Sequence, residues 1–386
     1  MYELGFILIY LYRFSWIGSI SKAFLIRLSF IQIRARKSNI ANNYTTSKNN
    51  VTFDLPHSLF NTYQLRLAII TFFLSFITQG QAQQLSFSKT HVEQGYSFKY
   101  QWLDHNKVGQ AISFTLNQEG LFDRFRNFKT YQNSYAQKTI IRRIKREMQR
   151  NPIAGIQIFY RQQHDGFLIE VNGLDSDKVA KSYQTLARVE SEVTKKYLQD
   201  NYYQAFTNHE QVNGIKVDHV SIANNSVADL KSLKPLILDH VSIQNIRKVT
   251  NYVLSFVQSI PYSTLESRIT SSGAGFNPPL QVLWENQGDC DSKMTLTAAL
   301  LRALMPRIDM TLIYIDGHAF IGIDIPGQAN EVTIEHNDVK YLLAEPTGPA
   351  LLPLGTLAPE SELAINQGQY IAQDYHEVLS NEISKQ

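Results

Sequence analysis

The sequence predicts an α+β fold in which a helix that begins at the single cysteine packs against an antiparallel sheet. Three observations predict this fold. A helical pattern starts at Cys290, and two strand patterns joined by Asp316-Gly317, a strong hairpin signal, follow it. A third strand pattern covers 340–344. With 386 residues, 44% of them apolar, the chain is long enough for a leader and two folded domains.

The N-terminal region is expected to be a leader and not part of the fold. The uncharged run LAIITFFLSFI (67–77), between Arg66 and a small-residue stretch, predicts a signal peptide over 65–82 that is cleaved between Ala82 and Gln83. An uncleaved anchor is the alternative, although the run is shorter than the roughly 20 residues of a membrane span. Residues 1–64 are expected to be a gene-prediction artefact or a dispensable extension.

The charge of the mature chain argues against nucleic-acid binding. Of the 37 basic and 34 acidic residues, eight basic and two acidic ones lie in 1–82, so the rest of the chain has 29 basic and 32 acidic groups. Binding to nucleic acid requires a clustered basic face, which this balance does not favour. The predicted signal peptide, in turn, indicates that the chain is exported, periplasmic or secreted, with no membrane span after cleavage.

Residues 83–240 are expected to form a mixed α+β N-terminal domain of unknown role. Strand patterns cover 96–102, 111–116, 155–160 and 167–171. Helical patterns cover 135–149 and a stretch from Ser176 or Asp177 to Gln199. The first helix is rich in arginine, which suggests either a membrane-surface or polyanion contact or, more simply, a solvated face. The polar stretch 208–234 is interpreted as a loop or domain junction.

A second domain is expected over 241–360. The segment from Val241 to Tyr262 predicts a helix with one apolar stripe, which consists of Ile243, Ile246, Val249, Val253 and Phe256. A short helix follows over 280–285. A helical tail is expected over 361–386.

Cys290 is the candidate nucleophile. Asp289 is a suitable N-cap for the helix that follows and ends before Pro306, so Cys290 lies in its first turn. There the helix dipole and free backbone N–H groups favour a thiolate with a lowered pKa, and the N–H groups can form an oxyanion hole. The alternative is that this lone cysteine is a small buried apolar residue.

His318 and Glu345 are the candidate base and orienting acid. His318 begins the second strand of the hairpin, and Glu345 ends the third strand. A cysteine at a helix start, a histidine on one strand and a carboxylate on a neighbouring strand can form a nucleophile, base and orienter. Glu345 is expected to accept a hydrogen bond from Nδ1–H of the imidazole.

Four stretches over about 241–355 resemble the transglutaminase-like superfamily, a branch of the papain-type thiol fold, and bacterial exported members in particular. They are FVQSIPY (256–262), GDCDSK (288–293), DGHAFIGID (316–324) and YLLAEPT (341–347). The resemblance implies a Cys, His, Asp triad, which is carried over to Cys290, His318 and position 345, where this chain has Glu in place of Asp. It also suggests Trp284 or Gln287 as an oxyanion-hole residue.

No metal or cofactor is expected. Asp289 and Asp291 flank the thiol, but two carboxylates alone are too few oxygen ligands for calcium, and capping explains Asp289. Lys293 is expected to face solvent or contact a loop. The sequence contains no glycine-rich phosphate loop.

The function expected from these residues is acyl transfer from an amide of a protein or peptide substrate through a Cys290 thioester. Water as the acceptor gives a cysteine peptidase or amidase, and an amine gives protein-glutamine acyl transfer; the sequence favours neither. The alternative is a catalytically inactive binding or assembly module with a cell-envelope partner.

Overall fold

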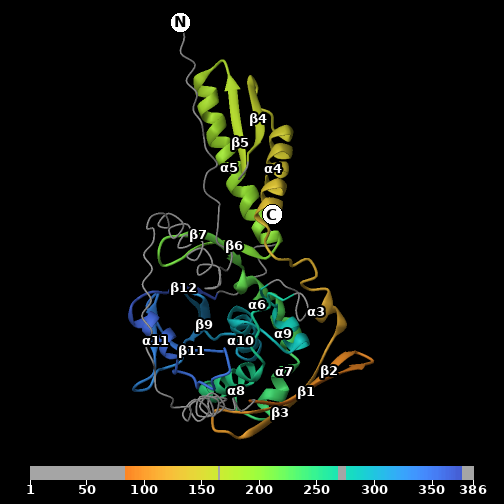
Figure 1. Ribbon diagram of the computed structural model, residues 1–386, viewed down its shortest axis with the longest axis vertical. Coiled ribbons are helices and arrows are strands. Elements are labelled where there is room, and N and C mark those ends of the chain that lie inside the picture. Colours follow the sequence, from red (N-terminus) through yellow and green to blue (C-terminus); the bar gives the residue numbers. More distant parts are fainter. Residues whose placement is uncertain (1–82, 164–165, 268–274, 376–386) are drawn as a thin grey trace, which may run out of the picture. The chain divides into compact units, whose positions relative to one another are not determined.

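A computed structural model describes residues 83–163, 166–267 and 275–375, which form an α+β fold with antiparallel sheets (Figure 1). The predicted signal peptide and the segment before it lie outside the described residues. The strands are β1 (Gln84–Val92), β2 (Gly95–Leu103), β3 (Gly109–Leu116), β4 (Ile156–Gln163), β5 (Gly166–Gly173), β6 (Tyr203–Thr207), β7 (Asn213–Val217), β8 (Met310–Ile315), β9 (His318–Ile323), β10 (Thr333–His336), β11 (Val339–Ala344) and β12 (Ile371–Asp374). The helices are α3 (Gln118–Phe122), α4 (Asn133–Arg150), α5 (Ser176–Asp200), α6 (His219–Leu230), α7 (Leu233–Leu238), α8 (Ile246–Ser259), α9 (Pro279–Glu285), α10 (Cys290–Leu304) and α11 (Pro359–Asn366).

The first sheet has the order β1-β2-β3 and is antiparallel. Alternate residues of β2 point into the core, because successive side chains of a strand face opposite sides; Phe98, Tyr100 and Trp102 are all buried. The indole N–H of Trp102 donates to the Ser255 hydroxyl of α8, at 3.1 Å. The predictions of β2 and β3 are confirmed, whereas β1 was not predicted.

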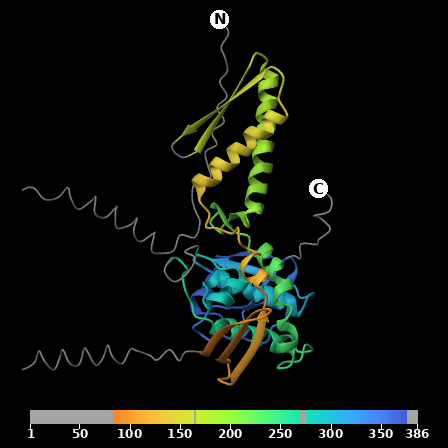
Figure 2. The ribbon, with the colours of Figure 1, turned by 90° about the vertical axis from the view of Figure 1, so that its right-hand side faces the viewer.

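The hairpin β4–β5 packs with α4 and α5, as Figure 2 shows. These elements have a small core of their own, to which Ile144, Val171 and Leu186 belong. The two strands and two helices predicted here are confirmed to within a few residues. The N-cap of α5 is Asp175, one residue before the predicted start, because its carboxylate accepts from the N–H groups of Asp177 and Lys178.

The prediction of a loop over 208–234 was wrong. This stretch contains β7, α6 and the start of α7. Asp218 caps α6 by accepting from the Ser221 N–H, and the face that holds Ile222 and Leu230 is fully buried. The polar composition hid the helix, since only one face of α6 is apolar and the rest is rich in Asn, Ser and Asp.

The second large sheet has five strands in the order β10-β11-β9-β8-β12, with antiparallel neighbours throughout. The predicted hairpin is confirmed as β8–β9, with Gly317 at φ 68° in the turn. The short edge strands β10 and β12 were not predicted. The segment 361–386, expected as a helical tail, instead begins within α11 and continues into β12, and 376–386 lie outside the described residues.

Helix α10 contacts α6, α8, α9 and β9, and it is buried on every side from Ser292 onward (Figure 1). One core cluster includes residues from β2, α7, α8, α10 and β9. It therefore contains residues from both sides of position 240, and the division of the chain at that position stays a prediction. No helix within the described ranges is long and apolar enough to span a membrane.

Helix α8 differs from the predicted helix at its start. Asn245 is the N-cap, so Ile243 lies before the helix, and both Ile243 and Ile246 are exposed, at 41% and 42%. The remaining residues of the predicted stripe, Val249, Val253 and Phe256, are buried. The apolar pattern was therefore right for the helix body and wrong for its first turn.

Candidate active site

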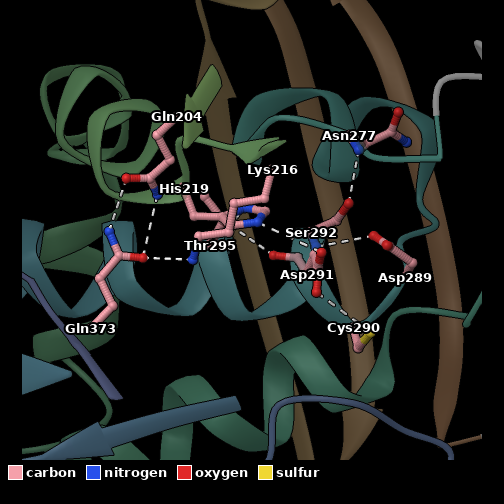
Figure 3. A network of polar contacts seen from close by, with 10 residues as sticks. All are labelled: Gln204, Lys216, His219, Asn277, Asp289, Cys290, Asp291, Ser292, Thr295 and Gln373. Carbon is pink, nitrogen blue, oxygen red and sulfur yellow. Dashed lines mark hydrogen bonds and ion pairs between the residues drawn. The ribbon is translucent and has the colours of Figure 1, made fainter. Parts of the chain in front are cut away.

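Cys290 is the first residue of α10, as predicted. Asp289 is the N-cap, and its Oδ1 accepts from the Ser292 N–H at 3.0 Å. The Ser292 hydroxyl in turn accepts from the Asn277 N–H at 2.7 Å (Figure 3). These bonds fix the first turn of the helix and with it the position of the half-buried thiol.

The loop before Cys290 is bound to the end of the FVQSIPY stretch. The Gly288 N–H donates to the Pro261 carbonyl at 3.2 Å, and the Ser263 N–H donates to the Gly288 carbonyl at 3.1 Å. Two stretches that carry the family resemblance are therefore adjacent in space. Their contact places the thiol-bearing turn against the C-terminal end of α8.

Lys293 strengthens the same contact. Its side chain is fully buried, and its Nζ donates to the Ile260 carbonyl at the end of α8. Burial lowers the pKa of this amine to about 7, against an opposing effect of Asp289. Of the two expectations for Lys293, exposure to solvent was wrong, and contact with a loop is confirmed, because the residue binds α10 to the chain that leaves α8.

His318 and Glu345 meet across neighbouring strands. The Nε2 atom of His318 lies 2.7 Å from Oε1 of Glu345, so the carboxylate binds Nε2 and not the Nδ1–H that we expected. The longer glutamate side chain, extending from the end of β11, approaches the ring from the Nε2 side. Nδ1 is then the ring nitrogen left for a proton from another group.

Glu345 is held as a carboxylate. Burial would raise its pKa, but hydrogen bonds from His318, from the Ala358 N–H to Oε2 at 2.8 Å, and from the Ser361 hydroxyl together lower it. Ala358 is the N-cap of α11. The start of α11 thus supplies donors that keep the orienting acid charged while it is buried.

Gln258, in the FVQSIPY stretch, holds the backbone of Glu345. Its Nε2 donates to the carbonyls of Glu345 and Leu352, each at 2.8 Å, and its Oε1 contacts His105 Nε2 at 3.0 Å. Gln258 is almost fully buried. Sequence reasoning missed this role, although Gln258 lies within a stretch that it singled out.

Cys290 lies against the start of β9. The backbone N–H of Ala319, the residue after His318, interacts with the Cys290 sulfur, and α10 packs on β9. Cys290 therefore lies beside the strand that His318 begins, and Glu345 contacts His318 from the end of β11. A direct contact between the Cys290 sulfur and the His318 ring stays a prediction.

The expectation of a lowered thiol pKa was wrong. Burial raises the pKa of Cys290, and the carboxyl groups of Asp291 and Asp289 raise it further, while N–H groups of Ala319 and Asp291 act in the opposite direction. The helix dipole favours a thiolate, but desolvation and two flanking acids outweigh it. Burial and the two flanking acids therefore disfavour the thiolate form of Cys290.

The two oxyanion candidates occupy different surroundings. Trp284 packs edge-on against Tyr96, with ring centroids 4.8 Å apart, and Lys89 Nζ lies 3.7 Å from its ring centroid. It therefore belongs to the contact between α9 and the first sheet. The Gln287 side-chain amide donates to Glu285 at 3.1 Å. The role of either residue in an oxyanion hole stays a prediction.

A buried polar network on α6 and β7, which sequence reasoning missed, lies on the other side of Asp291 (Figure 3). His219 is 1% exposed; its Nε2 lies 3.6 Å from Asp291 Oδ2. Lys216 Nζ donates to Gln373 Oε1 at 2.6 Å and lies 3.2 Å from the centroid of the Tyr314 ring. The only sequence signal was one histidine on the buried face of a helix that we had interpreted as loop.

One group of metal-type ligands lies together within the part of the chain that the structure describes. It consists of His209, Glu210 and Asp316, whose ligand atoms lie within 4.8 Å of one another. Glu210 and Asp316 are exposed, and exposed acids commonly cluster without an ion, so we assign no metal to them.

A half-open cavity of about 340 Å³ has aromatic walls, formed by Phe122, Phe125, Phe128 and Phe276.

Comparison of the chain with protein-family models, with curated proteins and with solved structures finds no match. The arrangement of Cys290, His318 and Glu345 is therefore the basis on which a function can be proposed.

Proposed function

We propose that this chain is a thiol enzyme that acts on amide bonds through a Cys290 thioester, with a core of the transglutaminase-like type. The observation that carries the proposal is the 2.7 Å contact between His318 Nε2 and Glu345 Oε1 beside a cysteine at a helix start. A carboxylate that binds one ring nitrogen orients the imidazole and leaves the other as a base.

The chemistry follows from the protonated thiol. When an amide carbonyl is bound, the Cys290 proton moves to Nδ1 of His318, and the sulfur attacks the carbonyl carbon. The imidazolium is stabilised by the Glu345 carboxylate and then protonates the leaving amine. The free N–H groups of the first turn of α10 are candidates to stabilise the oxyanion. Because burial, Asp291 and Asp289 raise the pKa of the thiol, the proposed mechanism requires His318 to receive the proton as the sulfur attacks.

The acceptor that ends the reaction decides between two activities. Water attacking the thioester gives peptide or amide hydrolysis, and an amine gives protein-glutamine acyl transfer. The substrate of the proposal is a protein or peptide. We place the enzyme in the periplasm or outside the cell, on the signal-peptide pattern of the sequence alone.

A binding or assembly module of the cell envelope is the second candidate. It is favoured by one specific observation, the raised pKa of the Cys290 thiol, caused by burial and by Asp291 and Asp289. An inert thiol of this kind fits a fold that is retained for binding. The two candidates therefore differ in whether His318 activates the sulfur.

Alkylation by iodoacetamide distinguishes them without knowledge of the substrate. Cys290 is the only cysteine of the chain, so the rate reports on one sulfur. For an enzyme we expect alkylation at neutral pH to slow at least about tenfold in His318→Ala, because the raised pKa of the thiol makes the reaction depend on His318 as proton acceptor. His336→Ala is the matched control, since His336 contacts Asp374 at 2.9 Å, outside the site.

An equal alkylation rate in wild type and in His318→Ala would support the binding module instead, provided that both proteins remain folded by circular dichroism.

A further inference from the structure

His219 and Asp291 form a second histidine and carboxyl pair, separate from His318 and Glu345. His219 begins α6 and is fully buried, and Asp291 is the second residue of α10. The two side chains face each other, with Nε2 3.6 Å from Oδ2 (Figure 3). The other carboxyl oxygen, Oδ1, lies 3.7 Å from the Cys290 sulfur and accepts its S–H. Asp291 thus lies directly between the buried histidine and the nucleophile.

The hydrogen bonds of Thr295 fix the tautomer of His219. The hydroxyl group has one hydrogen, which it donates to the Asp291 carbonyl at 2.7 Å. Its oxygen lies 3.1 Å from Nδ1 of His219 and can only accept there, so Nδ1 bears the ring hydrogen. Burial, and secondarily Lys216, lower the pKa of His219 well below its usual value. The ring is then neutral, and Nε2 presents a lone pair to Asp291.

A lone pair that faces a carboxylate oxygen is unfavourable in a buried site unless a proton lies between the two atoms. A proton on Oδ2 of Asp291 removes this repulsion, while the 3.6 Å separation is too long for a strong hydrogen bond. The desolvation of Asp291 acts in the same direction, because burial raises the pKa of this carboxyl. The geometry therefore favours a protonated Asp291 beside a neutral His219, and the pair has no net charge in that state.

We propose that His219 is a positioning residue that, by turning the Nε2 lone pair toward Asp291, keeps negative charge off the carboxyl group beside Cys290, so that the sulfur can become a thiolate during catalysis. The inference rests on the proposed function. In the activation step the thiol proton moves to Nδ1 of His318, and the carboxyl proton stays on Asp291. An ionised Asp291 would be an anion next to a forming anion, which opposes the step.

Other charged and titratable groups face Asp291 and are considered with it. They are Lys216 of β7, Tyr314 of β8, His318 of β9, and Cys290 and Asp289 beside it, while Asp218 before α6 faces Lys216 and Tyr314. A charged Lys216 would favour an ionised Asp291, but burial lowers the pKa of this amine well below its usual value. Its hydrogen bond goes to Gln373 and its ammonium lies over the Tyr314 ring, so His219 is the nearer partner of the carboxyl.

A double-mutant cycle on thiol reactivity tests the inference. His219→Gln keeps a polar side chain but replaces the lone pair that faces Asp291 with an amide N–H, which can donate to the carboxylate and stabilise its charged form. We expect alkylation of Cys290 by iodoacetamide at pH 7 to slow about tenfold in this variant, the effect of one added like charge. In an Asp291→Asn background no charge can form, so the same His219 change should alter the rate less than twofold. His336→Gln, at the other histidine and aspartate contact, should leave the rate unchanged.

Two outcomes would overturn the inference: His219→Gln alkylated within twofold of wild type, or an equal loss in the Asp291→Asn background. If His219→Gln does not fold, nitrogen-15 NMR of histidine-labelled wild type decides. The neutral Nδ1–H tautomer is expected for His219, and a neutral Nε2–H tautomer contradicts the pair. This spectrum also separates the two proposals. If His318→Ala leaves the alkylation rate unchanged, the thiol-enzyme function fails, but the spectrum can still show the pair of His219 and Asp291.

Discussion

Nε2 of His318 lies 2.7 Å from Oε1 of Glu345, and the second oxygen of Glu345 accepts the Ala358 N–H at the start of α11. The carboxylate of Glu345 therefore links β9, which begins with His318, to the start of α11. This contact orients the ring and leaves Nδ1 as the nitrogen that would receive the thiol proton in the proposed mechanism. Because the two contacts use different oxygens of Glu345, the orienting role of the residue can be tested apart from its structural role.

Replacement of Glu345 by Gln should lower kcat by about two to four orders of magnitude. The neutral amide no longer stabilises an imidazolium, and it can turn its NH2 group toward Nε2 in place of an oxygen. KM should change little, since Glu345 is not expected to touch the substrate. Steady-state kinetics on an identified substrate checks this. Glu331→Gln is the control: Glu331 binds Arg247 at 2.6 Å, outside the site, and its loss should leave kcat intact. An unaffected kcat in Glu345→Gln would remove the residue from the mechanism.

Replacement of Cys290 by Ser should abolish turnover, with a loss of at least about a thousandfold. The free energy of unfolding should change by less than about 0.5 kcal/mol, because the oxygen fits the half-buried position and can keep the bond to Asp291. Urea unfolding and an activity assay give the two values. A loss of several kcal/mol with residual turnover would show that Cys290 is a packing residue.

Lys293→Met should change how stability depends on pH. In the folded protein the pKa of Lys293 is lowered to about 7, and in the unfolded chain it is near 10.4. Between these values the unfolded state binds more protons, so the Lys293 contribution makes wild type more stable as pH rises, by up to about 1.4 kcal/mol per pH unit. The methionine variant should lack this rise between pH 7 and 10. Parallel curves for both proteins in urea unfolding would argue against a buried, neutral amine.

Gly348→Ala tests the close approach of the loop after Glu345 to α8. A Cβ at Gly348 would lie 2.2 Å from the Gln258 carbonyl oxygen, so the loop must shift. We expect a loss of about 1–3 kcal/mol in the free energy of unfolding, with a fall in kcat, because Gln258 also holds the Glu345 backbone. Gly109→Ala is the control, since nothing lies within 4 Å of a Cβ there. Equal stability of the two variants would contradict the packing argument.

Local signals predicted the elements that carry the candidate triad. The N-cap Asp289, the Asp316-Gly317 turn and the position of Glu345 at a strand end each depend on a few neighbouring residues, and each proved correct. The side of the ring that Glu345 binds depends on the path of the chain after β11, which no local pattern encodes. The sequence therefore indicated which residues meet but not by which atoms.

The features that sequence reasoning missed depend on contacts between distant parts of the chain. His219 and Thr295 are 76 positions apart, and only the packing of α6 on α10 brings them together. Lys293 is buried because α10 is covered on all sides, which its apolar stripe alone did not indicate. The thiol pKa was misjudged for the same reason, since desolvation is a property of the assembled core.

The most direct test of the central claim is a pH titration of the Cys290 thiolate by its absorbance near 240 nm, recorded as the difference before and after alkylation, in wild type and in His318→Ala. The single cysteine of the chain makes the signal unambiguous. If His318 and Cys290 share a proton, the thiolate should appear at lower pH in wild type than in the variant. Superimposable titration curves from two folded proteins would contradict the account.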